Sequence, residues 1–455
     1  MNDRMTLSSA MLLMILAAPP AVLAQTSGSA SALRVGAAKV DVTPTARELP
    51  KNSFGILDHL FSRAIVLESA GSTSALISVD AGGIPDALWQ TVSRQLETEL
   101  KIPAANILLT ATHTHSAGGQ RGPEYAQKIV ESVRVAKQRL APARMGHGTG
   151  VSYINVNRQI IDPKTHRWWE GPNYEGPSDK TVAVITFETL TGEPIAVYYN
   201  YAVHAVIAGQ LDQVSADIPG AASRYVEESL DDKAVALWSS GAAGDQNPIY
   251  FQQTYDLRDI RVKDYAKRGV DISNAMPPGG EGLNRNDPVV ARLMNQQRQM
   301  VLSMGQFLGE EVLHVLRGID RTQTVVPVSG SFTTVSCPGR ERTNDGRAGF
   351  EGAYKDGPPV EIRLGLLRLG DVMIGAVNAE VFNPIAQRLK RESPYAVTMM
   401  ATLTNGSARS GYIPDDASFG KYTFEVLSSR LQPGCAESSI VDGIIGLIDR
   451  SETSN

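Results

Sequence analysis

Residues Asn106–Gln120 read NILLTATHTHSAGGQ, and the interpretation of the whole chain starts from them. A β-type run, Ile107–Thr112, delivers His113 and His115 to its carboxyl end, and small residues follow. Residues two apart in a strand point to the same face, so both imidazoles can aim at one point. Imidazole suits zinc, and a catalytic zinc keeps one position open for water. The pattern predicts a metal site; the competing interpretation is two polar loop histidines.

Composition limits the class of protein. The chain has 455 residues, enough for one large or two ordinary domains, and a formal net charge of −5. Its 42% hydrophobic and 20% charged residues are the balance of a globular protein. The sequence has no long basic run, so we expect no nucleic-acid partner.

The first residues have the pattern of a secretory signal peptide. Arg4 is followed by the apolar run Met11–Ala18, and small residues allow cleavage after Ala24. We expect residues 1–24 to be removed, residues 25–32 to form a flexible leader, and the protein to be periplasmic or secreted. A membrane anchor is the alternative interpretation, but the apolar run is too short to span a bilayer.

Export bears on the oxidation state of the two cysteines. Cys337 and Cys435 can form one disulfide in an oxidising compartment. The sequence leaves open whether their Cα atoms come close enough to be bridged. Two cysteines so far apart are a poor set of zinc ligands.

Hydrophobic periodicity predicts a mixed α/β fold. Ser74–Val79 and Ile107–Thr112 read as strands, and Pro85–Lys101 between them has helical spacing, which makes a βαβ unit. Open α/β sheets bind ligands at the carboxyl ends of such strands. We expect a mixed β-sheet core with flanking helices in a single domain, residues 33–450, and a disordered tail at residues 451–455.

Three further residues near the ends of β-type runs are candidates for a functional role. His204 follows the apolar run AVYYNYAV, Glu380 follows the run before NAE, and Tyr412 ends the glycine-containing loop NGSARSGY. Each also has a structural explanation when taken singly: a packed histidine, a helix-capping glutamate and a rim tyrosine.

The loop GAAGDQNP, residues 241–248, and the segment after it differ from the regular elements around them. Small residues in the loop permit close approach of a ligand. The segment Ile249–Asp287 is irregular, charged and aromatic, and connections of that length are usually lids or binding loops. We expect a folded flap, helical around Asp259–Lys267, that covers part of the substrate cleft and sets the choice of acyl or amine group.

Eight segments carry a family resemblance when taken in order. They are VGAAKVDVTPT, SRAIVLES, LISVDAGG, TATHTHSAGG, NYAVHAV, GAAGDQNP, VNAEVFN and NGSARSGY. In this order they resemble the neutral/alkaline (non-lysosomal) ceramidase family over most of Leu33–Glu437. Members of that family are zinc amidases that cleave the N-acyl bond of ceramide. The resemblance implies zinc ligands at His113, His204, Glu380 and Tyr412.

The resemblance also implies roles near the scissile bond. His115 matches the second histidine of the family's HTHS motif, near the substrate carbonyl, and Arg158, in NVNR, matches its Asn-Arg segment. We expect zinc-bound water to attack an amide. His115 and Arg158 would then hydrogen-bond the developing oxyanion, or His115 would pass a proton to the leaving amine.

Three departures from the family pattern bear on activity. Asn247 stands where the GDxSPN motif of the family carries a serine, and an amide is no conventional nucleophile but can donate to an oxyanion or orient water. Phe424 is assigned to the position of the family's later-loop tyrosine. The chain is also too short for the additional C-terminal β-sandwich domain of full ceramidases, so none is expected.

The sequence therefore predicts an exported, zinc-dependent amidohydrolase of a ceramide-like N-acyl substrate that contacts membrane surfaces only transiently. One alternative is a zinc hydrolase of a small non-lipid amide, ester or lactone. Another, favoured by Asn247, is a metal-containing binding protein with little activity. The sequence gives neither the acyl and amine groups nor the oligomeric state.

Overall fold

The computed structural model describes residues 32–118, 122–273, 282–344 and 347–453. The described residues all belong to one compact unit. The expected signal peptide and nearly all of the expected leader lie outside the described residues. Within the described ranges, no helix combines the length and apolar character needed to cross a bilayer.

The largest sheet has nine strands and contains the predicted βαβ unit. Its strands are β1 (Arg34–Asp41), β2 (Phe61–Ser69), β3 (Ser72–Val79), β4 (Ile107–Ala111), β5 (Ala141–Val151), β8 (Thr181–Thr189), β9 (Pro194–Tyr201), β10 (Val235–Ser240) and β12 (Thr322–Gln323). They are ordered β10-β9-β8-β5-β1-β2-β3-β4, with β12 on β5. The pairs β3–β4 and β9–β10 are parallel, and the other pairs are antiparallel.

Both faces of this sheet are buried. In β2, Ala64 and Val66 point to one face and Ile65 and Leu67 to the other, and all four are inaccessible to solvent. The first face packs against four helices. These are α1 (Asp86–Leu100), α2 (Tyr125–Gln138), α3 (Asp217–Ser229) and α5 (Pro288–Arg317).

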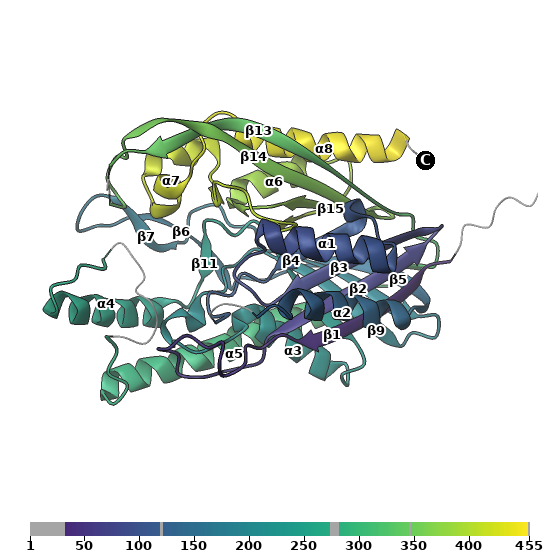
Figure 1. Ribbon diagram of the computed structural model, residues 1–455, viewed down its shortest axis with the longest axis horizontal. Coiled ribbons are helices and arrows are strands. Elements are labelled where there is room, and N and C mark those ends of the chain that lie inside the picture. Colours follow the sequence, from purple (N-terminus) through teal and green to yellow (C-terminus); the bar gives the residue numbers. More distant parts are fainter. Residues whose placement is uncertain (1–31, 119–121, 274–281, 345–346, 454–455) are drawn as a thin grey trace, which may run out of the picture. The chain divides into compact units, whose positions relative to one another are not determined.

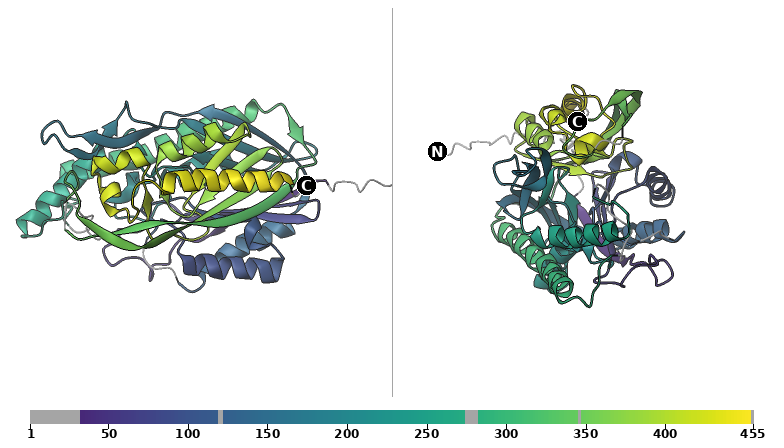
Figure 2. Two further views of the ribbon diagram at one scale, coloured as in Figure 1. Left: turned by 90° about the horizontal axis from the view of Figure 1, so that it is seen from above. Right: turned by 90° about the vertical axis from the view of Figure 1, so that its left-hand side faces the viewer.

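The second face packs against another sheet. That sheet has four strands, β13 (Val328–Arg342), β14 (Tyr354–Leu369), β15 (Val372–Val377) and β17 (Val397–Thr402). Its far side is covered by α6 (Asn383–Glu392) and α8 (Ala436–Thr453), so the unit is layered helix–sheet–sheet–helix (Figures 1 and 2). α8 continues to Thr453, where a disordered tail was expected from Ser451.

Smaller elements surround the carboxyl ends of these strands. They include a sheet of β11 (Gln246–Pro248), β6 (Asn155–Ile161) and β7 (Trp168–Asn173), and the pair β16 (Glu380–Val381) and β18 (Tyr412–Ile413). The helical pieces there are α4 (Gln252–Lys267), α7 (Phe424–Ser428) and the 3-10 turns η2 (Ile207–Gln210) and η3 (Asp416–Lys421). A further 3-10 turn, η1 (Ala104–Asn106), lies at the opposite end, where β4 begins.

Hydrogen bonds join the carboxyl ends of parallel strands from both large sheets. The pairs β3–β4, β9–β10 and β15–β17 are each connected through at least one helix. Ser240 Oγ, at the end of β10, donates to the carbonyl of Ala111 in β4 at 3.3 Å. Thr402 Oγ1, at the end of β17, donates to the carbonyl of Gly241 at 2.8 Å. Loops that leave these strands are therefore brought to one place.

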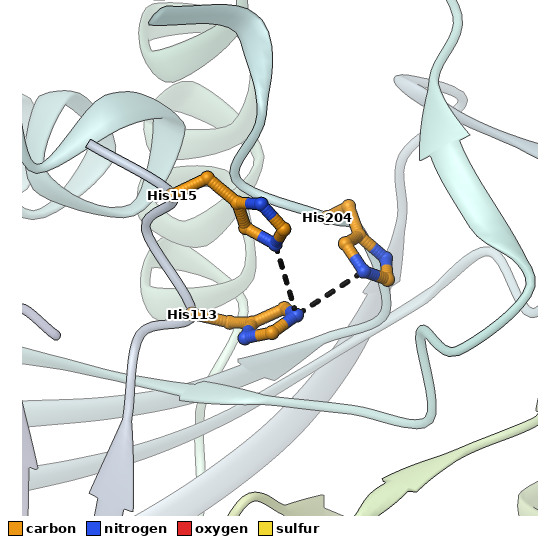
Figure 3. A group of neighbouring side chains, drawn as sticks. All are labelled: His113, His115 and His204. Atoms are coloured by element: carbon orange, nitrogen blue, oxygen red, sulfur yellow. Dashed lines mark hydrogen bonds between the residues drawn. The ribbon is translucent and has the colours of Figure 1, made fainter. Parts of the chain in front are cut away.

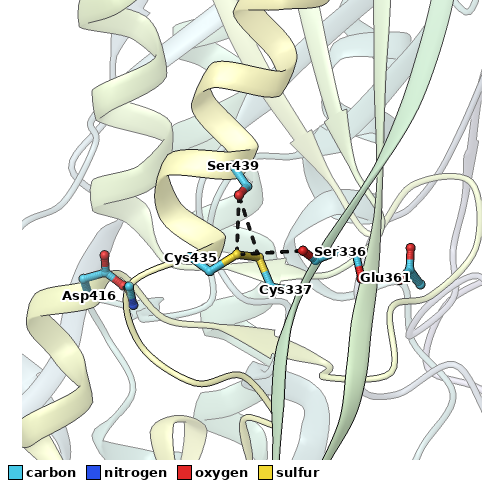
Figure 4. Close-up of a disulfide and its surroundings, with 7 residues drawn as sticks. Ser336, Cys337, Glu361, Asp416, Cys435 and Ser439 are labelled. Carbon is cyan, nitrogen blue, oxygen red and sulfur yellow. Dashed lines mark hydrogen bonds between the residues drawn. A yellow bond between two sulfur atoms is a disulfide. The ribbon is translucent and has the colours of Figure 1, made fainter.

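The disulfide that the sequence left open is present. Cys337 in β13 and Cys435 just before α8 are bonded, with Cα atoms 5.8 Å apart (Figure 4). The bond ties the second sheet to the helix that covers it. Because 98 residues separate the two cysteines, the bond closes a long loop in the unfolded chain.

Replacing both cysteines by serine should lower the free energy of unfolding by about 2–4 kcal/mol, because the unfolded chain regains the entropy of that loop. Urea unfolding followed by tryptophan fluorescence measures the change. A reductant should destabilise the wild type and leave the double variant C337S/C435S unaffected. Equal stability of the two proteins without reductant would contradict a stabilising bond.

Candidate metal centre

Three of the predicted metal ligands follow the ends of three separate strands. His113 follows β4, His204 follows β9, and Glu380 opens β16 shortly after β15. His113 has a left-handed backbone with φ of 65°. This conformation is uncommon for a residue with a side chain and tends to occur at functional sites.

The donor atoms of these residues converge. The Nε2 atoms of His113 and His204 lie 3.1 Å apart (Figure 3). Glu380 Oε2 lies 3.0 Å from His113 Nε2 and 3.2 Å from His204 Nε2. The structure thus brings together side chains that are up to 267 residues apart in the sequence.

Backbone carbonyls decide which nitrogen of each ring carries the hydrogen. His113 Nδ1 lies 2.6 Å from the carbonyl oxygen of Gly82, and His204 Nδ1 lies 2.7 Å from that of Ala243. A carbonyl only accepts, so each neutral ring is protonated at Nδ1 and presents a lone pair at Nε2. Two lone pairs and a carboxylate oxygen this close repel one another unless a proton or a cation lies between them. The donor set therefore fits a divalent metal such as zinc.

Electrostatics within the cluster favour the metal-binding forms of His204 and Glu380 but the protonated form of His113. Burial, followed by the nearby charge of Arg158, lowers the pKa of His204 to about 3. Burial raises the pKa of Glu380, but the two imidazoles outweigh it and hold that pKa well below its ordinary value. Burial also lowers the pKa of His113, but the Glu380 carboxylate outweighs this and raises it. Binding of a metal ion would therefore release at most one proton, the one shared by His113 and Glu380.

His115 belongs to the same cluster. Its Nε2 lies 3.3 Å from His113 Nε2 (Figure 3), and the donor atoms of the three histidines lie within 4.8 Å of one another. Its ring faces the adjoining cavity, whereas His113 and His204 are buried. Desolvation by the surrounding protein, then the other two histidines, holds the pKa of His115 well below its ordinary value. The geometry permits His115 either to bind the metal or, as predicted, to face the substrate.

Tyr412, the fourth predicted ligand, is placed by strand pairing. β18 runs parallel to β16, with Tyr412 opposite Glu380 in the register. Its hydroxyl accepts a hydrogen bond from Arg158 Nη2 at 3.3 Å, and its ring meets Phe424 edge-on with centroids 5.9 Å apart. Burial and the Glu380 carboxylate raise the pKa of Tyr412 well above its ordinary value, so the phenol is neutral.

Arg158 is buried and engaged by protein atoms. Besides Tyr412, it donates to Glu425 Oε1 at 2.6 Å, to Asn247 Oδ1 at 3.1 Å and to the carbonyl of Gly244 at 2.7 Å. The sequence predicted that Arg158 donates to an oxyanion. Its four hydrogen bonds hold these neighbours in place, and its side chain also lines the adjoining cavity, so donation to an oxyanion stays a prediction.

Asn247 is bonded at both ends of its amide. Its Oδ1 accepts from Arg158, and its Nδ2 donates to Glu170 Oε1 at 3.0 Å and to Tyr255 Oη at 3.3 Å. The predicted donation to an oxyanion would require one of these bonds to break. As it stands, Asn247 links Arg158 to β7 and α4.

Glu425 and Glu170 were not predicted from the sequence. Glu425 lies in α7, is 1% exposed, and is separated from Arg158 by 267 residues. Glu170, in β7, is separated from Asn247 by 77 residues and also forms an ion pair with Arg258 at 3.3 Å. No local spacing or motif marks either carboxylate, because only packing brings it to its partner.

A cavity of about 710 Å³ adjoins the cluster. His115, Arg158, Asn247 and Tyr412 all contribute to its lining. Its volume lies within the range of about 300–1,000 Å³ that is usual for small-molecule sites. Catalytic candidates and cavity therefore form one site.

The segment predicted as a flap supplies one wall of this cavity. The lining residues from this part of the chain are Phe251, Thr254, Tyr255, Arg258 and Ser273. The helix α4 begins at Gln252, earlier than predicted, and its buried Arg261 forms an ion pair with Asp212 at 2.7 Å. The wall is thus anchored to the body of the protein. Residues 274–281, also part of the predicted flap, lie outside the described residues.

Comparison with known proteins agrees with the resemblance seen in the sequence. The model of the family described as neutral/alkaline non-lysosomal ceramidase, N-terminal, matches residues 34–339. The neutral ceramidase of Pseudomonas aeruginosa is 28% identical over 279 residues, which cover 51% of this chain and 41% of that protein. The neutral ceramidase of Drosophila pseudoobscura pseudoobscura is 26% identical over 342 residues, covering 67% and 47%. The matched region is thus less than half of either relative.

Solved structures share the fold. A structure described as "Ceramidase complexed with C2" superposes with a TM-score of 0.69 at 16% identity, covering 92% of this chain and 76% of that one. The crystal structure of neutral ceramidase from Pseudomonas aeruginosa gives a TM-score of 0.67 at 18% identity, covering 92% and 75%. At these identities the likeness concerns the fold.

Glu425→Ala should lower the free energy of unfolding by about 3–5 kcal/mol, because it leaves Arg158 as a buried charge without its carboxylate. The control Glu392→Ala removes an ion pair with Arg388 at 2.7 Å, in which Glu392 is 43% exposed. That change should cost only about 0.5 kcal/mol. Urea denaturation measures both variants; equal losses would show that the buried pair contributes no more than the surface one.

Proposed function

Because the chain belongs to the neutral/alkaline non-lysosomal ceramidase family, we propose that it is a metal-dependent amidohydrolase that cleaves the N-acyl bond of a ceramide-like lipid amide. The observation that carries this proposal is the convergence of His113 Nε2, His204 Nε2 and Glu380 Oε2 at 3.0–3.2 Å. His115 lines the adjoining cavity, so a substrate bound in that cavity would lie next to the cluster.

The metal in this proposal is zinc, held by His113, His204 and Glu380 with Tyr412 as the fourth protein group. Support for zinc comes from the nitrogen and oxygen donors and from the family resemblance. When bound, zinc lowers the pKa of a coordinated water to about 7 and polarises a carbonyl.

The proposed reaction is direct hydrolysis by water, without a covalent enzyme intermediate. The oxygen of water adds to the amide carbonyl carbon, the carbon–nitrogen bond breaks, and the proton lost by water reaches the departing nitrogen through His115 Nε2. Asn247 has no nucleophilic atom, so no acyl-enzyme forms. Arg158 positions Tyr412 and Asn247 through its hydrogen bonds.

Export to the periplasm or the exterior is part of the proposal. The disulfide between Cys337 and Cys435 supports it, because such bonds persist in oxidising compartments. The pattern of residues 1–24, with a positive end, an apolar run and small residues, supplies the signal.

The metal assignment predicts about one zinc ion per chain and near-complete loss of zinc in His113→Ala and in His204→Ala, because each removes one donor. Elemental analysis of gel-filtered protein measures the content. His115→Ala separates the two arrangements that the geometry permits: the metal is kept if His115 faces the substrate and lost if it is a ligand. Full zinc content in both His113→Ala and His204→Ala would refute the ligand set.

The proposed activity predicts release of fatty acid from N-acyl sphingosines, abolished by a chelator and restored by zinc. Asn247→Ala should lower turnover by at most about 10²–10³-fold, because it loosens the positioning of Arg158 without removing a nucleophile. Mass spectrometry of the quenched wild type should detect no acylated protein, and an acyl-enzyme would refute direct hydrolysis by water. A zinc-loaded protein that cleaves no amide or ester would instead be the metal-containing binding protein.

A further inference from the structure

One wall of the cavity is held by arginines that the proposed reaction does not use. This wall is the segment Gln210–Gln213, which begins at the end of η2 and places Gln210, Asp212 and Gln213 in the cavity lining. Arg261 reaches it from α4, Arg298 from α5, and Arg285 from the loop before α5. We call it the arginine-backed wall.

Arg261 binds the first half of this wall. Its Nε donates to Gln210 Oε1 at 3.0 Å, and its Nη2 donates to Asp212 Oδ2 at 2.7 Å. Arg261 and Asp212 are both buried, with side-chain exposures of 2% and 5%. This ion pair neutralises one of the three guanidinium charges.

Arg285 and Arg298 bind the second half through neutral acceptors. Arg298 donates from Nε and Nη2 to Gln213 Oε1 at 3.3 and 3.0 Å. Arg285 donates from Nη2 to the carbonyl of Leu211 and stacks on Phe54, with its Cζ 3.4 Å from the ring centroid. Four consecutive residues, Gln210–Gln213, are thus each bonded to a guanidinium group.

The charges of the arginine-backed wall do not cancel within the part of the chain that the structure describes. There, Asp212 is the one carboxylate within ion-pair distance of any of the three arginines. Burial lowers the pKa of Arg285, the charges of Arg298 and Arg261 lower it further, and Asp212 opposes them. In addition, Arg285 Nε is buried without a hydrogen-bond partner among the described residues. Among the described residues, positive charge therefore exceeds negative charge behind this wall.

The excess charge lies beside the cavity that serves the metal centre. His115 and Arg158 line the same cavity as Asp212 and Gln213. Protein walls of low dielectric strengthen a charge's effect on a ligand inside such a cavity. A substrate that reaches the metal centre would thus experience this field along part of its length.

We propose that the arginine-backed wall is a subsite for an anionic group of the substrate, so that the preferred amides carry a carboxylate or a phosphate away from the scissile bond. The inference rests on the proposed amide hydrolysis and narrows its substrate class. The side-chain amide of Gln213 donates a long hydrogen bond of 3.4 Å to the carbonyl of Phe54. Because this bond is weak, the amide is available to bind the anion directly. Arg298 and Arg285 stabilise its charge from behind.

Three substrates with one acyl chain test the subsite. N-dodecanoylglycine carries a carboxylate, N-dodecanoyl-phosphoethanolamine a phosphate, and N-dodecanoylethanolamine no charge. We expect the wild type to show a kcat/KM at least about tenfold higher for one or both anionic amides than for the uncharged one. The comparison of the two anionic amides identifies which anion is bound. The preference should weaken as salt is added.

Charge-removing variants locate the preference. Arg298→Gln and Arg285→Ala should each raise KM for the anionic amide by about tenfold or more and leave the uncharged amide unchanged. The matched control is Arg292→Ala, which removes an exposed arginine from the same helix, α5, and should alter neither substrate. Thermal unfolding and zinc content show whether each variant is folded. Arg285→Ala, which removes one backbone contact, keeps the test available if Arg298→Gln does not fold.

Two outcomes would overturn the subsite. One is a wild type without preference for either anionic amide. The other is an equal loss on charged and uncharged substrates in folded Arg298→Gln and Arg285→Ala, which would make these arginines structural only. If no amide is cleaved, the proposed function fails separately, and calorimetric titration of the same three compounds into wild type and Arg298→Gln still decides whether the wall binds an anion.

Discussion

Repulsion among three electron-pair donors is the constraint on which the rest of the site depends. The donor atoms His113 Nε2, His204 Nε2 and Glu380 Oε2 lie 3.0–3.2 Å apart. At this distance their lone pairs repel one another unless a proton or a cation lies between them. The carbonyls of Gly82 and Ala243 fix the two rings, and the pairing of β16 with β18 fixes the carboxylate. A folded chain that holds such an arrangement is preorganised for a cation.

The two large sheets contribute different parts of this arrangement. The histidines follow strands of the nine-stranded sheet, whereas Glu380, Tyr412 and Glu425 come from the part of the chain that builds and covers the four-stranded sheet. The region matched by the family ends at residue 339, so those three lie beyond it. Packing between the sheets, with Ser240 and Thr402 bridging the strand ends, is therefore a condition for a complete metal centre.

Arg158 and Asn247 connect the candidate metal centre to the adjoining cavity. Arg158 binds Glu425, Tyr412 and Asn247, and Asn247 in turn binds Glu170 of β7 and Tyr255 of α4. An amide suits this position because it offers one acceptor to the arginine and two donors to the cavity wall. A continuous chain of hydrogen bonds thus connects α4 to Tyr412.

The sequence by itself determined the features that depend on local periodicity and residue type. Alternation along Ile107–Thr112 and the helical spacing of Pro85–Lys101 predict the βαβ unit, and the strand carries His113 to the edge where ligands bind. Order and identity of motifs then identified the family. Tertiary structure alone decided that Asn247 links Arg158 to Glu170, that Cys337 bonds to Cys435, and that Glu425 pairs with Arg158. The reason is physical: periodicity acts over a few residues and is visible in the sequence, whereas partners separated by 98 or 267 residues meet only when whole layers pack together.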